Sequence, residues 1–374
     1  MDKTEKAAES AKPGQSTSPS PEQQTLTLQE ALDLAVQHHT AGDLSKAEDI
    51  YQQILQADPN QPDALHLLGV IAHQGGENDR AVDLINKALA IKPDFAEAHS
   101  NLGNVLREMG HLDDAVFSCC KALSNKPEFP EAHNNLGNAL RELGRLDEAL
   151  ASYHKALASK SDFAEAYSNL GTTLKELERL EEAITHYHKA LAIKPNFVEA
   201  YSNLGNTLKE LGRLEEAIAN YHKALVIEPN YAEAYNNLGN ALQELGQLEP
   251  AIAHFNKSID IKPDYAEAHF NLHPLLLDPF DMAPSIKCME KAVDISPDRR
   301  DFRFILGMLL DYSGNPQEAK PHFDIVEKGV NADHAKLDAW RYIKSANKRM
   351  PPIIGSRIEA LALGIDAAVN DGLV

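Results

Sequence analysis

Residues 130–163 read PEAHNNLGNALRELGRLDEALASYHKALASKSDF. In the first half of this stretch, apolar residues recur at helical spacing from Ala132 to Leu143 and form one stripe. Gly144 then interrupts the pattern, and a second stripe of the same period runs from Leu146 to Leu157. The stretch therefore predicts two amphipathic helices joined by a tight turn.

The same pattern returns every 34 residues along most of the chain. A glycine marks the eighth position of the unit at Gly69, Gly103, Gly137, Gly171, Gly205, Gly239 and, after His273, at Gly307. An alanine at the twentieth position and an aromatic residue four positions later are expected to let the two helices approach closely. Most units close on a proline, which cannot continue a helix. A fixed period of this length predicts a stack of small identical units.

The Leu-Gly pair, the Ala-x3-Tyr/Phe spacing and the closing proline together resemble the tetratricopeptide repeat. The resemblance implies an all-α fold, a right-handed α-solenoid of about nine helix-turn-helix repeats within residues 28–333. Counting by 34 places the first residues of the units at Leu28, Pro62, Ala96, Pro130, Ala164, Val198, Ala232, Ala266 and Arg300.

The segments outside the clear repeats carry different predictions. Residues 1–25 lack large apolar residues beyond Met1 and are predicted to be a disordered tail. In the eighth unit, Pro274 is expected to kink or end the first helix. Residues 334–374 are predicted to form further helices around a linker at 348–355, and the apolar ending suggests a truncation before another domain.

Composition narrows the classes of partner. The formal net charge is −20, with no dense basic cluster, which argues against a nucleic-acid partner. The longest apolar runs, such as 304–310, are too short to span a bilayer, and no secretory leader is recognisable. Three cysteines indicate a reducing compartment, and we expect a cytoplasmic protein without a membrane partner. Cys119 stands in the aromatic column and is expected to fill core space.

The sequence contains no pattern typical of a catalytic, cofactor-binding or metal site. It lacks a P-loop, a GxGxxG turn after a strand, HExxH and GxSxG. His154, His188 and His222 are spaced by 34 residues, so they form one column of the repeat on a solvated surface. We therefore expect no enzyme activity, no cofactor and no metal within residues 1–374.

The candidate binding residues lie on the first helix of each unit. Its apolar stripe predicts that positions two, five, six, nine, twelve and thirteen are exposed. Position six is Asn101, Asn135, Asn169, Asn203, Asn237 and Asn271; position nine is Asn104, Asn138, Thr172, Asn206 and Asn240; position twelve is Arg107, Arg141, Lys175, Lys209 and Gln243. Position two is a glutamate in each of these units.

Asparagine is a mediocre helix former, so its repetition at position six needs a reason. Its amide matches the N–H and C=O of one residue of an extended peptide. The column resembles the asparagine ladder of the O-linked N-acetylglucosamine transferase repeats, which implies a concave groove that grips a peptide backbone. The alternative is structural: asparagine bonds neighbouring helices across the stack. Likewise, the glutamate and Arg/Lys columns favour either a partner of mixed charge or surface pairs three or four residues apart.

Two classes of function remain open from the sequence. The first is a scaffold that binds a protein or an extended peptide, with self-association left open. The second is the recognition arm of an enzyme whose catalytic domain lies beyond residue 374, either a peptide glycosyltransferase or a methyltransferase that uses S-adenosylmethionine. The latter rests on residues 340–374, which resemble the lead-in to macrocin O-methyltransferase-like domains. In the ninth unit, Phe304 and Ile305 replace the polar residues of the face, so we expect the face to end or be covered there.

Overall fold

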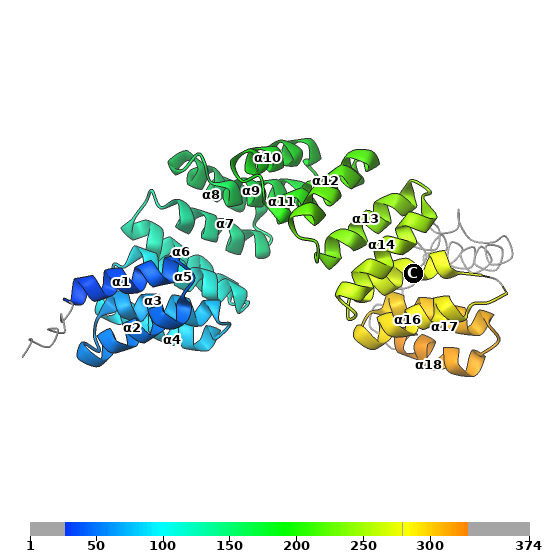
Figure 1. Cartoon of the computed structure of the whole chain (residues 1–374), viewed down its shortest axis with the longest axis horizontal. Helices are drawn as coiled ribbons and strands as arrows, with labels where there is room; N and C mark the ends of the chain where they lie inside the picture. The colour runs from blue at the N-terminus through cyan, green and yellow to red at the C-terminus, as the bar shows by residue number, and fades with distance from the viewer. Residues whose placement is uncertain (1–26, 279, 328–374) are drawn as a thin grey trace, which may run out of the picture. The chain divides into compact units, whose positions relative to one another are not determined.

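The computed structural model describes residues 27–278 and 280–327. They fall into two compact units, one ending at Pro127 and one beginning at Glu128. Figure 1 shows that each unit consists of helices paired in chain order. Within the described residues no strand occurs, and the only β-type pairing is an isolated bridge between Asp278 and Asp281.

The N-terminal unit contains three helix pairs. They are α1 Leu28–Thr40 with α2 Leu44–Ala57, α3 Pro62–Gln74 with α4 Asn78–Ile91, and α5 Ala96–Glu108 with α6 Leu112–Asn125. Thr27 caps α1, because its hydroxyl accepts from the Glu30 amide while the Glu30 carboxylate accepts from the Thr27 amide.

The C-terminal unit contains six further pairs. They are α7 Pro130–Glu142 with α8 Leu146–Ser159, α9 Ala164–Glu176 with α10 Leu180–Ile193, α11 Val198–Glu210 with α12 Leu214–Ile227, α13 Ala232–Glu244 with α14 Leu248–Ile261, α15 Ala266–Leu272 with α16 Ala283–Ile295, and α17 Arg300–Tyr312 with α18 Pro316–Glu327. All nine first helices of the chain begin at the predicted residues, which confirms the all-α fold of nine helix-turn-helix repeats.

The turn inside each pair uses a left-handed residue. Gly144 and Gly212 have φ of +74° and +73°, a region that a side chain disfavours. Glu178 takes the same place in the pair α9–α10 with φ of +59°. It is the one non-glycine residue of the described chain with positive φ.

The core lies between the helices of each pair. Tyr153, Tyr187, Tyr221 and Phe255 from the second helices are fully buried. Each ring lies against the glycine of the facing first helix; a Cβ on Gly205 would stand 2.6 Å from Cε1 of Tyr221. The predicted role of the glycine and aromatic columns in close helix approach is thus confirmed. Cys119 is fully buried at the same place and fills core space, as expected.

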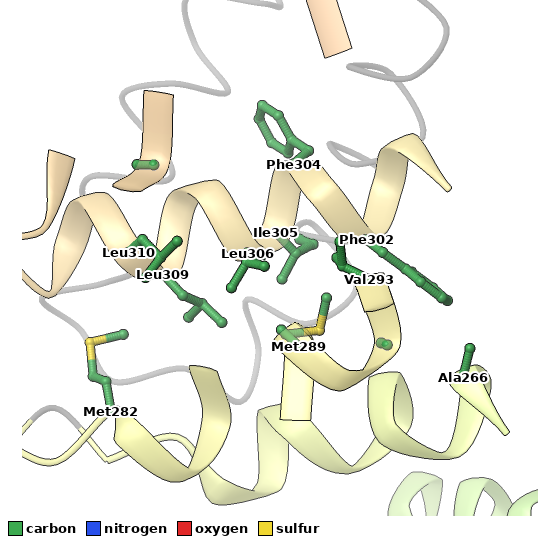
Figure 2. Close-up of a cluster of buried hydrophobic side chains, with 12 residues drawn as sticks. Ala266, Met282, Met289, Val293, Phe302, Phe304, Ile305, Leu306, Leu309 and Leu310 are labelled. Carbon is green, nitrogen blue, oxygen red and sulfur yellow. The ribbon is translucent and has the colours of Figure 1, made fainter. Parts of the chain in front are cut away.

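The eighth and ninth pairs depart from the pattern. Helix α15 ends at Leu272, and a short 3₁₀ helix, η1 His273–Leu276, carries Pro274, which confirms the predicted break. Figure 2 shows Ile305 and Leu306 pointing from α17 toward Met289 of α16, while Phe304 points to the opposite side of α17. Phe304 packs edge-on against Phe323 of α18 and is buried, as is Ile305. The apolar replacements in the ninth unit therefore serve its own core.

The predictions for residues 1–25 and for 334–374 lie outside the described residues, and so does the resemblance at 340–374. Within the described part, no helix is long and apolar enough to cross a membrane.

Candidate functional site

The candidate face is carried by the first helices of the pairs. In the C-terminal unit, α7, α9, α11, α13 and α15 follow one another so that each contacts the next but one in the chain. The six position-six asparagines, Asn101 to Asn271, are all partly exposed. One carboxamide per repeat is therefore presented on the same side of each first helix.

Three of these carboxamides bond the preceding first helix. The amide nitrogen of Asn169 donates to Oδ1 of Asn134 at 3.0 Å, and that of Asn271 donates to Oδ1 of Asn236 at 2.9 Å. In the N-terminal unit the amide nitrogen of Asn101 lies 2.8 Å from Nε2 of His66. The structural use of asparagine is real wherever position five of the preceding repeat offers an acceptor of sufficient length.

Position five itself corrects a prediction. His66, Ser100, Asn134, Ser168, Ser202 and Asn236 were expected on the exposed stripe, yet all are buried. They lie under the following first helix, where the acceptors just described meet position six. The helical wheel of one helix cannot show this cover, because a neighbouring repeat provides it.

Asn203 differs from its sister residues. Position five before it is Ser168, whose short side chain does not reach it. The structure gives no hydrogen bond to the Asn203 carboxamide, which is partly exposed. Asn237 accepts only a long contact of 3.4 Å from Asn236 in its own helix. Asn135 has interactions within the chain. The carboxamide of Asn203 is therefore the one with the most free hydrogen-bonding capacity.

The position-nine residues are held by buried tyrosines, which the sequence analysis did not anticipate. The hydroxyls of Tyr153, Tyr187 and Tyr221 donate to Asn138, Thr172 and Asn206 at 2.8, 3.2 and 2.7 Å. Asn240 faces Phe255, which has no hydroxyl, and its carboxamide has no hydrogen bond. Asn104 lies near His73 of the preceding repeat, 3.2 Å from its Nε2. The alternation of Tyr and Phe in the aromatic column was the available signal.

The charged columns pair between repeats rather than within one helix. Arg141, Lys175 and Lys209 bind Glu176, Glu210 and Glu244 of the next first helix at 3.0, 3.2 and 3.4 Å. Arg107 contacts Glu108 and has a further partner. The expected pairs at three or four residues are therefore wrong for position twelve. The cationic column is largely neutralised within the chain.

The histidine column also pairs differently from its spacing. His154 packs edge-on against His186 of the next second helix, with centroids 6.5 Å apart, and His222 packs against His254 in the same way. Burial lowers the pKa of His186 to about 4. No group of three or more metal-ligating side chains occurs among the described residues.

Family models match more than half of the chain. A model described as TPR repeat matches residues 137–178, 172–212 and 205–246, and models described as Tetratricopeptide repeat match residues 38–103, 96–129, 121–151 and 232–265. No curated protein sequence matches this chain.

Among solved structures, the Cut9–Hcn1 hetero-tetramer of the APC/C resembles this chain with a TM-score of 0.57 and 20% identity, over 77% of this chain and 55% of that one. This likeness shows the fold. YrrB, described as a TPR protein with an unusual peptide-binding site, has a TM-score of 0.41 and 27% identity, over 52% of this chain and 98% of its own. MamA has a TM-score of 0.40 and 27% identity, over 44% and 97%.

Proposed function

Because this chain belongs to the tetratricopeptide repeat family, whose stacked helix pairs present extended binding surfaces, we propose that it is a protein-interaction scaffold. Its ligand is an extended peptide segment of a partner protein, bound along the position-six asparagines of the first helices. The observation that carries this proposal is the partly exposed carboxamide of Asn203, which has no hydrogen bond within the protein.

The chemistry of the carboxamide suits a peptide backbone. An asparagine offers two donors and one acceptor and so matches the C=O and N–H of a single residue. Asn169 and Asn271 use one donor for the neighbouring helix and keep the carboxamide oxygen for a ligand. Helices pack about 8–10 Å apart and an extended chain covers about 3.3 Å per residue, so each carboxamide meets about every third ligand residue.

Magnitudes restrict what the asparagines do. Two hydrogen bonds per repeat contribute about 1–3 kcal/mol. Ordering three backbone residues costs about 3–6 kcal/mol. The asparagines therefore select an extended backbone, and side-chain contacts of the ligand must supply the affinity.

The experiment compares asparagines with and without a partner inside the protein. We expect Asn203→Ala combined with Asn240→Ala to weaken the binding of peptides selected from a displayed random library, because both carboxamides are free. The matched control is Asn256→Ala, an exposed asparagine on the second helix α14. Circular dichroism should show unchanged helicity in both variants. Equal peptide affinities in the two variants would remove the asparagines from the binding face.

A further inference from the structure

A cation joins the two ends of each helix pair in the C-terminal unit. Lys160, just after α8, lies with Nζ 3.2 Å from the carboxylate of Glu131 at the start of α7. The same Nζ stands 4.6 Å from the ring centroid of Phe163. The ammonium is thus held by one carboxylate and one aromatic face, which are the groups that attract an organic cation.

The next repeats keep this arrangement. Lys194 lies 2.9 Å from Glu165 and 4.4 Å from the centroid of Phe197. Lys262 lies 3.1 Å from Glu233 and 5.2 Å from the centroid of Tyr265. In the eighth pair, Arg299 lies 3.2 Å from Glu267 and 4.0 Å from the centroid of Phe302. The cation is a constant part of these repeats.

The repeat 198–231 lacks it. Glu228 occupies the place of the lysine, with backbone angles φ −125° and ψ 89° against φ −125° and ψ 86° at Lys194. Glu199 and Glu228 are exposed, and neither forms an ion pair. No lysine or arginine of the described residues lies over the ring of Tyr231. Two carboxylates and an aromatic ring here surround the place where a cation lies in the sister repeats.

Electrostatics agree with this proximity. Burial raises the pKa of the Tyr231 hydroxyl, and the carboxylates of Glu233, Glu199 and Glu228 raise it further. Glu233 is bound by Lys262, so its charge is balanced. The charges of Glu199 and Glu228 have no balancing group in the repeat.

We propose that Glu199, Glu228 and Tyr231 form a cation slot that binds a lysine or arginine side chain of the extended peptide ligand. The inference rests on the proposed function and supplies one of the side-chain contacts that the asparagines require. Glu199 is one helical turn before Asn203, about 6 Å along α11. A ligand bonded to the free carboxamide of Asn203 therefore passes within side-chain reach of the cation slot.

The occupant is an organic cation rather than a metal ion. Ca²⁺ takes six to eight oxygen ligands, and an aromatic face offers none. In the sister repeats the same groups hold ammonium or guanidinium ions. The net charge of −20 also attracts a basic ligand.

The test uses libraries of short capped peptides with one fixed residue, lysine, arginine, norleucine or glutamate, at each position in turn. For the full chain we expect one position at which lysine and arginine bind about five- to tenfold more tightly than norleucine. In Glu228→Lys the protein supplies its own cation, and this preference should disappear. In Lys194→Glu a second cation slot is opened, and a second preferred position should appear about three residues from the first.

The control is Glu215→Lys, which makes the same charge change at an exposed residue of the same repeat without an ion pair. It should keep the preference of the unaltered protein. Peptide binding without a preferred basic position would overturn the cation slot and leave the proposed function standing. Loss of the preference in millimolar Ca²⁺ would assign the carboxylates to a metal ion and also overturn it. Absence of any peptide binding would remove both proposals.

Discussion

The hydroxyl of Tyr221 donates a hydrogen bond of 2.7 Å to Oδ1 of Asn206. The tyrosine is fully buried and belongs to the second helix, whereas the asparagine is partly exposed on the first. The aromatic core of a repeat therefore fixes the orientation of a carboxamide on the candidate binding face. In the next repeat Phe255 and Asn240 have the same places without the bond.

Replacing Tyr221 with Phe should lower the free energy of unfolding by about 1 kcal/mol, since the ring packing is kept and one hydrogen bond is lost. The reverse change, Phe255→Tyr, should raise it by a similar amount by giving Asn240 a donor. Urea titrations followed by circular dichroism measure both. If neither variant shifts the midpoint, the tyrosine–asparagine bond has no part in stability.

Asn169→Ala should destabilise the C-terminal unit by about 1–3 kcal/mol, because Oδ1 of the buried Asn134 loses its donor. Asn203→Ala breaks no hydrogen bond, and alanine is the better helix former, so its stability should be equal or slightly higher. Thermal unfolding of the two variants side by side checks this. Equal losses would mean that Asn203 has a structural partner after all.

Glu178→Gly should stabilise the protein by about 0.5–1 kcal/mol. The left-handed conformation at φ +59° costs a side chain about 1–2 kcal/mol, and the greater flexibility of glycine in the unfolded chain offsets part of the gain. The matched variant is Gly212→Glu, which should lose a comparable amount. Differential scanning calorimetry would decide, and a destabilised Glu178→Gly protein would rule out backbone strain at this turn.

Stability of the N-terminal unit should depend on pH through His66. Burial lowers the pKa of His66 to about 4, against about 6.5 in the unfolded chain. The unfolded state therefore binds the proton first, so the stabilisation is complete above pH about 6.5 and is lost as the pH falls toward 4. The loss amounts to at most about 3 kcal/mol.

The matched variant for His66 is His66→Asn, the residue found at this position in two sister repeats as Asn134 and Asn236. It keeps an acceptor for Asn101 and has no proton to gain in this range. Urea midpoints between pH 7 and 4 should be flatter in the variant than in the unaltered protein. Parallel curves would assign the acid sensitivity to other groups.

Much of the fold follows from the sequence because its determinants are local. The glycine at position eight and the aromatic residue at position twenty-four lie in one helix pair, and their spacing recurs with the period of 34. Helical periodicity also gave the start of every first helix, from Leu28 to Arg300. The eighth repeat was readable too, because Pro274 cannot continue a helix.

The candidate site was predicted only in part. Position six was placed correctly on a partly exposed face, whereas position five was expected there and is buried. A helical wheel describes one helix in isolation, but the following repeat covers position five. The ion pairs of Arg141, Lys175 and Lys209 join residues 35 apart, so no analysis of one helix predicts them.

By itself the sequence determined the paired helices, their boundaries and their stacking into repeats, because these depend on short-range spacing and backbone preference. The tertiary structure alone decided which carboxamides remain free and which charges are balanced. Glu199 and Glu228 are 29 residues apart, and they become neighbours only when α12 returns to the start of α11. Contacts of that kind depend on the packing of one helix against another, which a one-dimensional pattern does not contain.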